Sequence, residues 1–262
     1  MGVETEIAWT DHTFNPWWGC TKISPGCANC YAMAFDRRVG GKHWGPAAPR
    51  RIFGEKHWAE PLKWNEAAKK SGKPGLTFCA SMADVFEAAA PLTEREKLWP
   101  LIRATPYLRW QLLTKRPERV AAALPADWGD GYENVWLGTT VEDQHRADMR
   151  LPILRSLPAR VRFVSVEPML EAMDLRGRLD GVAWVIVGGE SGGGARPMRD
   201  EWTDPILAAC AEVGAAPFVK QMGSVWAREK HTKHPKGGDP MEWRPELRVR
   251  RFPHDASARI AA

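Results

Sequence analysis

The chain has 262 residues, of which 44% are hydrophobic and 26% charged, the composition of a globular protein with material for a sizeable core. This composition excludes wholesale disorder, and no stretch approaches the roughly 18 consecutive apolar residues that a bilayer span needs, so we expect no membrane association. The formal charge of +5 permits a polyanionic partner, but such a surplus is also common in proteins that never contact nucleic acid.

The five cysteines, an odd number with three of them clustered, fit reduced thiols better than a secreted disulfide framework. The opening residues Met1 to Glu6 contain no basic segment followed by an apolar one, so the sequence predicts no export signal. We therefore expect a cytoplasmic protein.

The first predicted strand, Ile7 to Thr10, leads into a loop that carries the three clustered cysteines. Cys20, Cys27 and Cys30 fall within eleven residues, with Pro and Gly bending the chain between them. Thiolates gathered in this way are soft ligands for zinc or an iron–sulfur cluster, and three ligands rather than four leave one coordination position open. Residues 31–39 have helix-compatible composition, so Cys30 is expected at a helix N-terminus, where the helix dipole lowers the pKa of a thiol.

Spacing alone leaves three interpretations of this loop open. The first is an iron–sulfur cluster with an open iron. The second is a closed structural zinc site, in which His12 or His43 supplies the fourth ligand. The third is a redox pair formed by Cys27 and Cys30, in which Cys20 has no part.

A polar and basic insertion, residues 40–75, follows, and we expect it to be irregular apart from one helix near residues 60–70. Beyond it, short runs rich in β-branched and aromatic residues alternate with stretches of helical spacing, the pattern of β-α units with a parallel sheet. The predicted strands are 76–80, 108–113, 135–138, 161–166, 182–187 and 217–219, and the predicted helices include 93–104, 143–157 and 201–213.

Polar residues follow nearly every predicted strand, and this regularity favours a barrel over an open sheet. In a β/α barrel the carboxyl ends of all strands converge on one mouth, whereas an open sheet brings together only the ends beside its switch point. The alternative is that strand ends are polar because they meet solvent. We expect an α/β fold, a partial (β/α) barrel of about six to seven parallel strands over residues 1–222, with a C-terminal extension at 223–262 that carries an edge strand over residues 247–252.

The strand ends supply the candidate site residues. Glu167, Lys115 and Glu142 are candidate acids or bases at the mouth, with structural ion pairs as the alternative. Gly188 and Gly189 would let the backbone approach a ligand closely, while Glu190 could accept hydrogen bonds from an amine or a ribose hydroxyl, although a flexible turn is the alternative. Trp17 and Trp18, beside the first cysteine, are candidates to stack on a planar substrate such as a base.

The sequence resembles the uncharacterised phage-associated three-cysteine-motif family along essentially its whole length. The motifs that carry the resemblance are Trp9-Thr10-Asp11, Asn15-Pro16-Trp17, Gly19-Cys20, Ser24-Pro25-Gly26-Cys27, Cys30-Tyr31-Ala32, Thr114-Lys115-Arg116-Pro117, Gly138-Thr139-Thr140-Val141-Glu142, Ser165-Val166-Glu167-Pro168, Gly188-Gly189-Glu190-Ser191-Gly192, Arg196-Pro197-Met198, Phe218-Val219-Lys220-Gln221 and Lys236-Gly237-Gly238-Asp239-Pro240. The resemblance implies membership of, or kinship with, the radical S-adenosylmethionine (SAM) superfamily.

The resemblance also implies the cofactors. Cys20, Cys27 and Cys30 would hold a four-iron four-sulfur (4Fe-4S) cluster whose open iron chelates SAM, and reduction would cleave SAM to a radical that abstracts a substrate hydrogen. The spacing departs from the usual superfamily pattern, because six residues separate Cys20 from Cys27. The superfamily's Gly-Gly-Glu for the SAM amine usually ends the second strand, a position that Ser81 to Asp84 hold in this sequence.

We therefore predict a radical SAM enzyme that acts on a nucleic-acid base or nucleotide, with an external electron donor and a partner protein. Its catalytic candidates are Glu167, Lys115 and Glu142, and its SAM-binding candidates are Ser81, Asp84, Thr139, Gly188, Gly189 and Glu190. The alternative is a zinc-stabilised nucleic-acid-binding protein without catalytic activity, in which the cysteine loop is structural.

Overall fold

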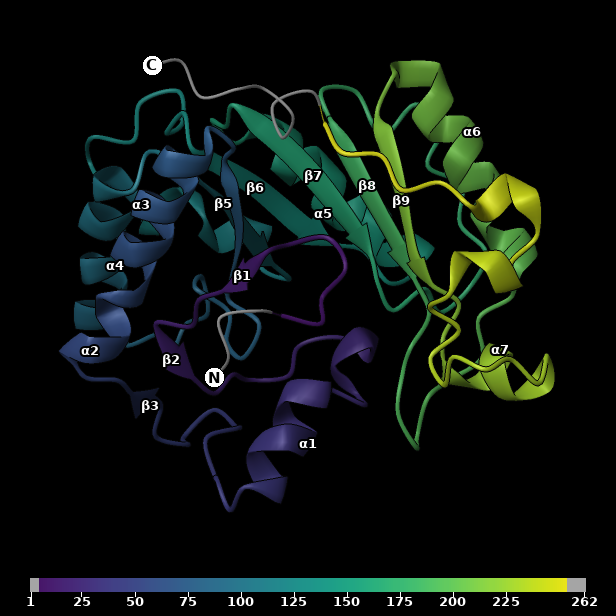
Figure 1. Ribbon diagram of the computed structural model, residues 1–262, viewed down its shortest axis with the longest axis horizontal. Helices are drawn as coiled ribbons and strands as arrows, with labels where there is room; N and C mark the ends of the chain where they lie inside the picture. Colours follow the sequence, from purple (N-terminus) through teal and green to yellow (C-terminus); the bar gives the residue numbers. More distant parts are fainter. Residues whose placement is uncertain (1–4, 254–262) are drawn as a thin grey trace.

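The computed structural model describes residues 5–253, and in them a curled parallel sheet forms the centre of the molecule (Figure 1). Its seven strands follow one another in the order β1-β4-β5-β6-β7-β8-β9, so each new strand is added beside the previous one of the sheet. The bounds are β1 (His12–Thr13), β4 (Gly75–Cys79), β5 (Leu108–Thr114), β6 (Val135–Thr140), β7 (Val161–Val166), β8 (Trp184–Gly188) and β9 (Ala216–Gln221). This half-barrel confirms the predicted α/β fold class.

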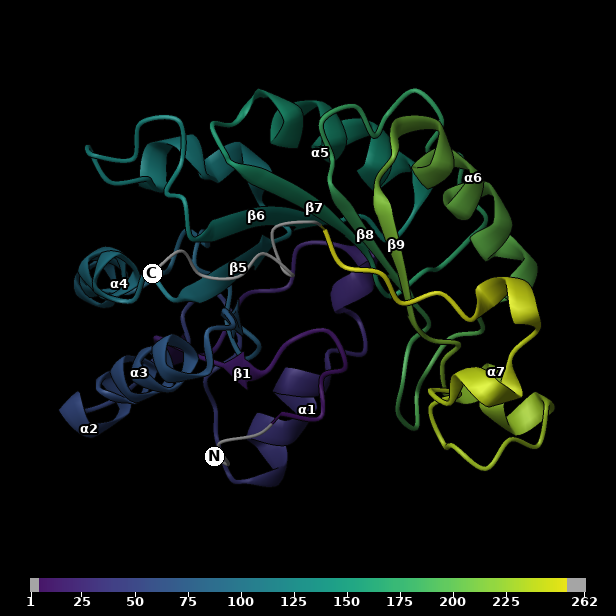
Figure 2. The ribbon, with the colours of Figure 1, turned by 45° about the horizontal axis from the view of Figure 1, so that its top comes forward.

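Helices between the strands cover the convex side of the sheet, as Figure 2 shows for α4, α5 and α6. The helices are α1 (Tyr31–Arg38), α2 (Glu55–Trp58), α3 (Glu60–Ser71), α4 (Leu92–Ala104), α5 (Gln144–Ser156), α6 (Thr203–Val213) and α7 (Ser224–Glu229). Short 3₁₀ turns lie at Pro25–Cys27, Pro117–Arg119, Ala121–Ala123, Asp200–Trp202, Pro240–Glu242 and Pro245–Leu247. Asp143 is the N-cap of α5, and its side chain accepts a hydrogen bond from the Arg146 N–H at 2.8 Å. Aspartate is one of the residues preferred at this position, so the start of the helix follows from the sequence.

Two predicted elements were wrong. Ile7 to Thr10 is not a strand, because the Thr10 N–H donates back to the Ile7 carbonyl in a turn, and pairing with β4 begins only at Asp11. The expected edge strand over 247–252 is reduced to one antiparallel bridge between Phe218 and Arg250. Two backbone hydrogen bonds flank this bridge, from the Val219 N–H to the Val249 carbonyl and from the Arg251 N–H to the Pro217 carbonyl, both at 2.9 Å.

Aromatic side chains fill the concave interior of the half-barrel towards the amino ends of the strands. The cluster consists of Trp9, Phe78, Trp136, Phe163, Trp184, Ile186 and Phe218, each at most 7% exposed. Trp184 meets the rings of Trp9 and Trp136 edge-on at 5.9 and 5.7 Å, and Phe252 stacks on it at 5.4 Å. The interior is therefore packed at this end, and polar groups are left to the opposite end, the mouth, where the strands have their carboxyl ends.

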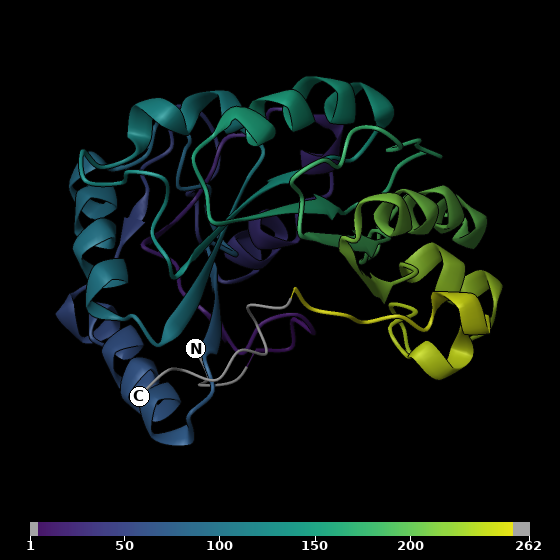
Figure 3. The ribbon, with the colours of Figure 1, turned by 90° about the horizontal axis from the view of Figure 1, so that it is seen from above.

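The insertion at 40–75 contains β3 (Arg51–Ile52), which pairs antiparallel with β2 (Trp17–Trp18), as well as α2 and α3. The segment beyond β9 runs alongside α6 (yellow in Figures 1 and 3), where Arg244 binds the Asp204 carboxylate at 2.5 Å. The predicted division between a barrel at 1–222 and an extension at 223–262 stays a prediction, and residues 1–4 and 254–262 lie outside the described part. Within residues 5–253, no helix is both long and apolar enough to cross a bilayer.

Candidate active site at the mouth of the half-barrel

The three clustered cysteines lie on one loop over the mouth. Cys20 follows β2, Cys27 ends a 3₁₀ turn, and Cys30 is the N-cap of α1, as the sequence predicted. All three are free thiols and partly exposed, whereas Cys79 and Cys210 are buried. The loop thus presents three sulfur donors to the space above the strand ends.

Asn15 anchors the start of this loop to the segment that follows β4. Its side chain is fully buried, donates from Nδ2 to the Ser81 hydroxyl at 3.0 Å and accepts the Met82 N–H at 2.6 Å. The Gly19 N–H reaches the Met82 carbonyl at 3.0 Å. Ser81 also accepts, through its carbonyl, a hydrogen bond from the Tyr31 hydroxyl at 2.7 Å. The candidate Ser81 is therefore partly exposed and connects the cysteine loop to the sheet through these hydrogen bonds.

Asp84 supports Cys20 from beneath through Arg116. The Arg116 Nη1 lies 2.7 Å from Asp84 Oδ2 and 3.8 Å from the Cys20 sulfur, and its other terminal nitrogen donates to the Thr21 carbonyl. Thr114 completes the cradle by donating to Asp84 at 2.8 Å. Burial, and after it the carboxylates of Asp84 and Glu87, raise the pKa of Cys20 to about 12, against the opposing effect of Arg116.

Glu142 holds the middle of the loop. It is fully buried, accepts the Gly26 N–H at 3.2 Å and pairs with Arg150 Nη1 at 2.7 Å. A Cβ on Gly26 would lie 3.0 Å from the carboxyl carbon, so glycine allows this close approach. Burial alone would raise the pKa of Glu142, but Arg150 and these hydrogen bonds outweigh it and keep that pKa below its ordinary value.

Lys115 acts electrostatically on the second cysteine. Burial raises the pKa of the Cys27 thiol, but the Lys115 ammonium and hydrogen bonds from Ile23 and Ser24 together bring it below its ordinary value. A lowered pKa favours the thiolate, which is the form that binds metal. The surroundings of Cys20 therefore favour the neutral thiol, whereas those of Cys27 favour the thiolate.

Glu190 ties the glycine-rich loop, residues 189–197, to the last cysteine. Its carboxylate accepts Asn29 Nδ2 at 3.0 Å and forms two bonds with the Arg196 guanidinium, at 2.9 and 2.6 Å. Asn29 also donates to the Gly194 carbonyl at 2.6 Å. Burial would raise the pKa of Glu190, but the bonds from Arg196 and Asn29 keep it below its ordinary value. Asn29 directly precedes Cys30, so this loop also positions the third thiol.

The ends of β7 and β9 supply an ion pair at the mouth. Lys220 Nζ lies 2.5 Å from Glu167 Oε1, and both side chains are about one fifth exposed. Gly188 leaves room for the Glu167 carboxyl, since a Cβ there would lie 3.3 Å from its carboxyl carbon. Thr139, by contrast, is fully buried and donates to the Thr114 carbonyl at 3.0 Å. The mouth thus offers both a cation and an anion to a polar ligand.

The stacking prediction for Trp17 and Trp18 was wrong. Trp17 is fully buried and Trp18 is 6% exposed, because β2 pairs with β3 and the Trp18 ring packs edge-on against Phe35 and Phe53. Sequence reasoning also missed the side chains that fix the loop, which are Asn15, Asn29, Arg116, Arg150 and Arg196. Asn15, Arg116 and Arg196 stand within recognised motifs, but a motif does not reveal which residue each of them contacts.

The donor set fits a cluster better than the closed zinc site. Within residues 5–253, no three His, Cys, Asp or Glu side chains gather closely enough to hold a single metal ion. His43 lies 2.7 Å from the Asp36 carboxylate, and His12 stacks on Trp64 at 4.5 Å. An iron–sulfur cluster does not need such a point, because each of its thiolates binds a separate iron.

The half-barrel is similar in fold to a solved structure of spore photoproduct lyase. The chain belongs to the family described as "Protein of unknown function (DUF5131)", whose model matches residues 4–245. A solved variant of spore photoproduct lyase matches with a TM-score of 0.52 and 13% identity, over 84% of this chain and 78% of that one.

Other solved structures of the same lyase match less closely. A variant with bound AdoMet and a dinucleoside spore photoproduct gives a TM-score of 0.49 at 13% identity, over 84% of this chain and 58% of that one. A further variant gives 0.47 at 14% identity, over 78% and 74%. The chain thus spans less than two thirds of the first of these two proteins, and no curated protein matches its sequence.

Proposed function

We propose that this protein is a radical SAM enzyme in which Cys20, Cys27 and Cys30 hold a 4Fe-4S cluster. The observation that carries the proposal is the position of the loop, which presents three free thiols over the polar mouth of a half-barrel packed shut at its other end. The similarity of the fold to spore photoproduct lyase supports the same class. When bound, the cluster supplies the electron that cleaves SAM and so generates the radical that attacks the substrate.

The chain's own residues orient the loop and exclude water. Asp84 holds the start of the cysteine loop through Arg116. Glu142 and Glu190 instead bond to the loop directly, at the Gly26 N–H and at the Asn29 side chain, and are themselves paired with Arg150 and Arg196. The aromatic cluster closes the interior below, so a substrate at the mouth is shielded from that side. In this proposal the three carboxylates position the loop and do not transfer protons.

SAM is proposed to lie between the cysteine loop and the ends of β4 and β8. Ser81 is partly exposed there, whereas Gly188 and Gly189 are buried and let the Glu167 side chain and the Met222 backbone pack closely beneath this surface. Lys220 and Glu167 are the charged pair at the mouth that can meet the charged groups of SAM or of the substrate. Asp84 and Thr139, which are buried and bonded within the framework, support this surface from below.

The proposed substrate class is a nucleic-acid base or a nucleotide. The proposal also includes an external electron donor and a partner protein. Its remaining parts are a cytoplasmic location and an association with phage. The substrate proposal rests on the surface of this chain that is described below.

SAM cleavage tests the proposal directly. Anaerobic protein reconstituted with iron and sulfide should form 5′-deoxyadenosine from SAM on addition of dithionite, and the product can be measured by chromatography. A Cys27→Ala variant should form none, whereas Cys210→Ala, which alters a buried thiol on α6, should retain the activity. Absence of product from wild-type protein with a full complement of cluster would refute the enzyme proposal and leave a metal-stabilised binding protein.

A further inference from the structure

The end of α1 and the segment after it together carry the positive excess of the whole chain. Residues 37–54 contain five Arg or Lys and no Asp or Glu, while the full sequence has 37 basic and 32 acidic side chains. Outside this segment the two signs therefore balance. A surplus concentrated in one short segment is a local electrostatic feature, unlike the modest net charge of the protein as a whole.

Most of these cations are open to solvent. Arg37, Arg38, Lys42 and Arg51 are exposed, and none of the four makes a salt bridge within residues 5–253. Arg38 lies over the Phe35 ring at 5.3 Å, and Arg51 lies over Trp18 at 4.6 Å. The fifth cation, Arg50, is different, because its guanidinium bonds twice to the buried Glu87, at 2.7 and 2.9 Å. Arg50 anchors the segment, and the other four face outward.

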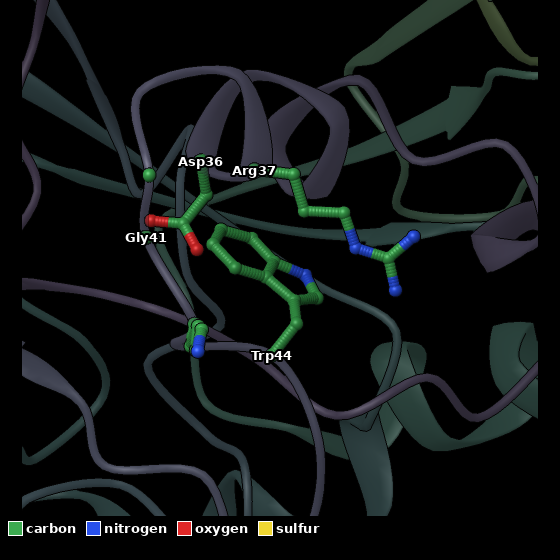
Figure 4. Close-up of a pocket in the computed structure, with 6 residues that line it drawn as sticks. Asp36, Arg37, Gly41 and Trp44 are labelled. Carbon is green, nitrogen blue, oxygen red and sulfur yellow. The ribbon is translucent and has the colours of Figure 1, made fainter.

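A hollow of about 410 Å³ lies at the start of this segment (Figure 4). It is lined by Asp36, Arg37, Gly40, Gly41, Lys42 and Trp44, and the Trp44 ring lies between the side chains of Asp36 and Arg37. The Asp36 carboxylate is already engaged, since it accepts hydrogen bonds from the backbone and the ring of His43, at 3.1 and 2.7 Å. The Trp44 ring packs in part against the cluster of Trp18, Ala32 and Met82, and its remaining surface lines the hollow together with the two cations. The space has the size that ligand sites have.

The backbone of the segment that forms this hollow packs against the cysteine loop. The Gly45 N–H donates to the Cys20 carbonyl at 3.0 Å. Gly19, with a φ of +114°, packs so closely that a Cβ on it would lie 2.2 Å from the His43 carbonyl oxygen. The segment is therefore fixed against the loop that carries the first thiol.

We propose that residues 37–54 bind a single-stranded nucleic acid, with the Trp44 ring stacked on one base and Arg37 and Lys42 in contact with phosphates. The inference rests on the proposed function and extends it, because it makes the substrate a strand rather than a free nucleotide. Cations contact the backbone of any sequence, and an aromatic ring stacks on any base, so the binding is sequence-tolerant and depends on salt. An acidic protein would use the cations but would have no use for the open ring beside them.

Fluorescence anisotropy with a labelled oligothymidylate of about twelve nucleotides measures this binding over a series of salt concentrations. The double variant Arg37→Gln/Lys42→Gln should weaken binding and lower the slope of log K against log salt by about 1.4, since each phosphate contact contributes about 0.7 on single strands. The matched control is Lys63→Gln/Lys70→Gln, which removes the same charge from exposed positions on α3, a helix that lies apart from α1 in Figures 1 and 2. The control should leave the slope unchanged.

Trp44→Leu should lower the affinity about 5- to 150-fold with an unchanged salt slope, as expected for loss of one stacked base. Equal weakening by the two double variants would show that only net charge matters and would overturn the proposed surface. If the affinity of Trp44→Leu equals that of the wild type, the proposal that the Trp44 ring stacks on a base is refuted.

The same preparations, assayed for 5′-deoxyadenosine without oligonucleotide, separate this inference from the proposed function. Wild-type protein that cleaves SAM but binds no oligonucleotide would overturn the inference alone. Wild-type protein that binds the oligonucleotide as described but cleaves no SAM would overturn the enzyme proposal alone.

Discussion

The buried pair of Glu142 and Arg150 offers the sharpest test of how the cysteine loop is held. The change is Glu142→Gln, which keeps the size of the side chain and one acceptor oxygen for the Gly26 N–H but removes the charge that faces Arg150 at 2.7 Å. The Glu142 side chain is 0% exposed and that of Arg150 is 9% exposed, so the substitution leaves an almost fully buried cation without its counter-ion.

The expected loss follows from this burial. Breaking a buried ion pair on one side lowers the free energy of unfolding by about 3–5 kcal/mol, because the remaining charge stays desolvated. For a chain of this size each kcal/mol corresponds to about 2–4 °C, so the melting temperature should fall by roughly 6–20 °C. Differential scanning calorimetry at pH 7 measures the change.

The pH dependence carries a defined sign. The pKa of Glu142 lies below its ordinary value of 4.5 in the folded protein, so its stabilising contribution is fully present above pH 4.5 and is lost as the pH falls through the lowered pKa. The difference between wild type and Glu142→Gln should therefore shrink in acid.

The matched control for this substitution is Glu133→Gln, which breaks an exposed pair with Arg160 and should change the melting temperature far less. If both variants melt alike at pH 7, Glu142 does not clamp the loop.

Three further substitutions test the rest of the site. Glu190→Gln removes the charge that holds Arg196, and hydrogen exchange of the glycine-rich loop should become faster; unchanged exchange would refute its tie to that carboxylate. Gly189→Ala places a Cβ 2.2 Å from the backbone carbonyl that follows β9 and should cost about 1–3 kcal/mol in chemical denaturation, whereas Gly193→Ala, with nothing within 4 Å, should not; equal costs would contradict the packing. Lys220→Met should reduce SAM cleavage about tenfold without lowering iron content, and full activity would exclude a role for this cation at the mouth.

The fold was predictable because buried parallel strands are short apolar runs separated by helices. The runs at 108–113 and 161–166 correspond to β5 and β7 almost residue for residue. β1 was misplaced because it has only two residues, too few for a periodic signal, and its position is fixed by pairing with β4. The prediction of an edge strand over residues 247–252 was wrong for a related reason, because a single bridge between Phe218 and Arg250 leaves no pattern in the sequence.

The candidate site was predictable in its donors but not in its supports. Cysteines at close spacing are visible in a sequence, whereas the partner of a buried carboxylate is set by packing between distant segments. Asp84 meets Arg116 across 32 positions, and no pattern in the sequence marks that pair. The burial of Trp18 was hidden in the same way, because its pairing with Arg51 joins the cysteine loop to a segment that has no strand signal of its own.

Metal content after anaerobic reconstitution tests the central claim most directly, with iron, sulfide and zinc measured alongside the absorption spectrum. The account predicts about four irons per chain and a broad band at roughly 400 nm in wild type and in Cys210→Ala, and loss of both in Cys27→Ala. A colourless wild-type protein that retains one zinc per chain, or a band of equal strength in Cys27→Ala, would contradict it.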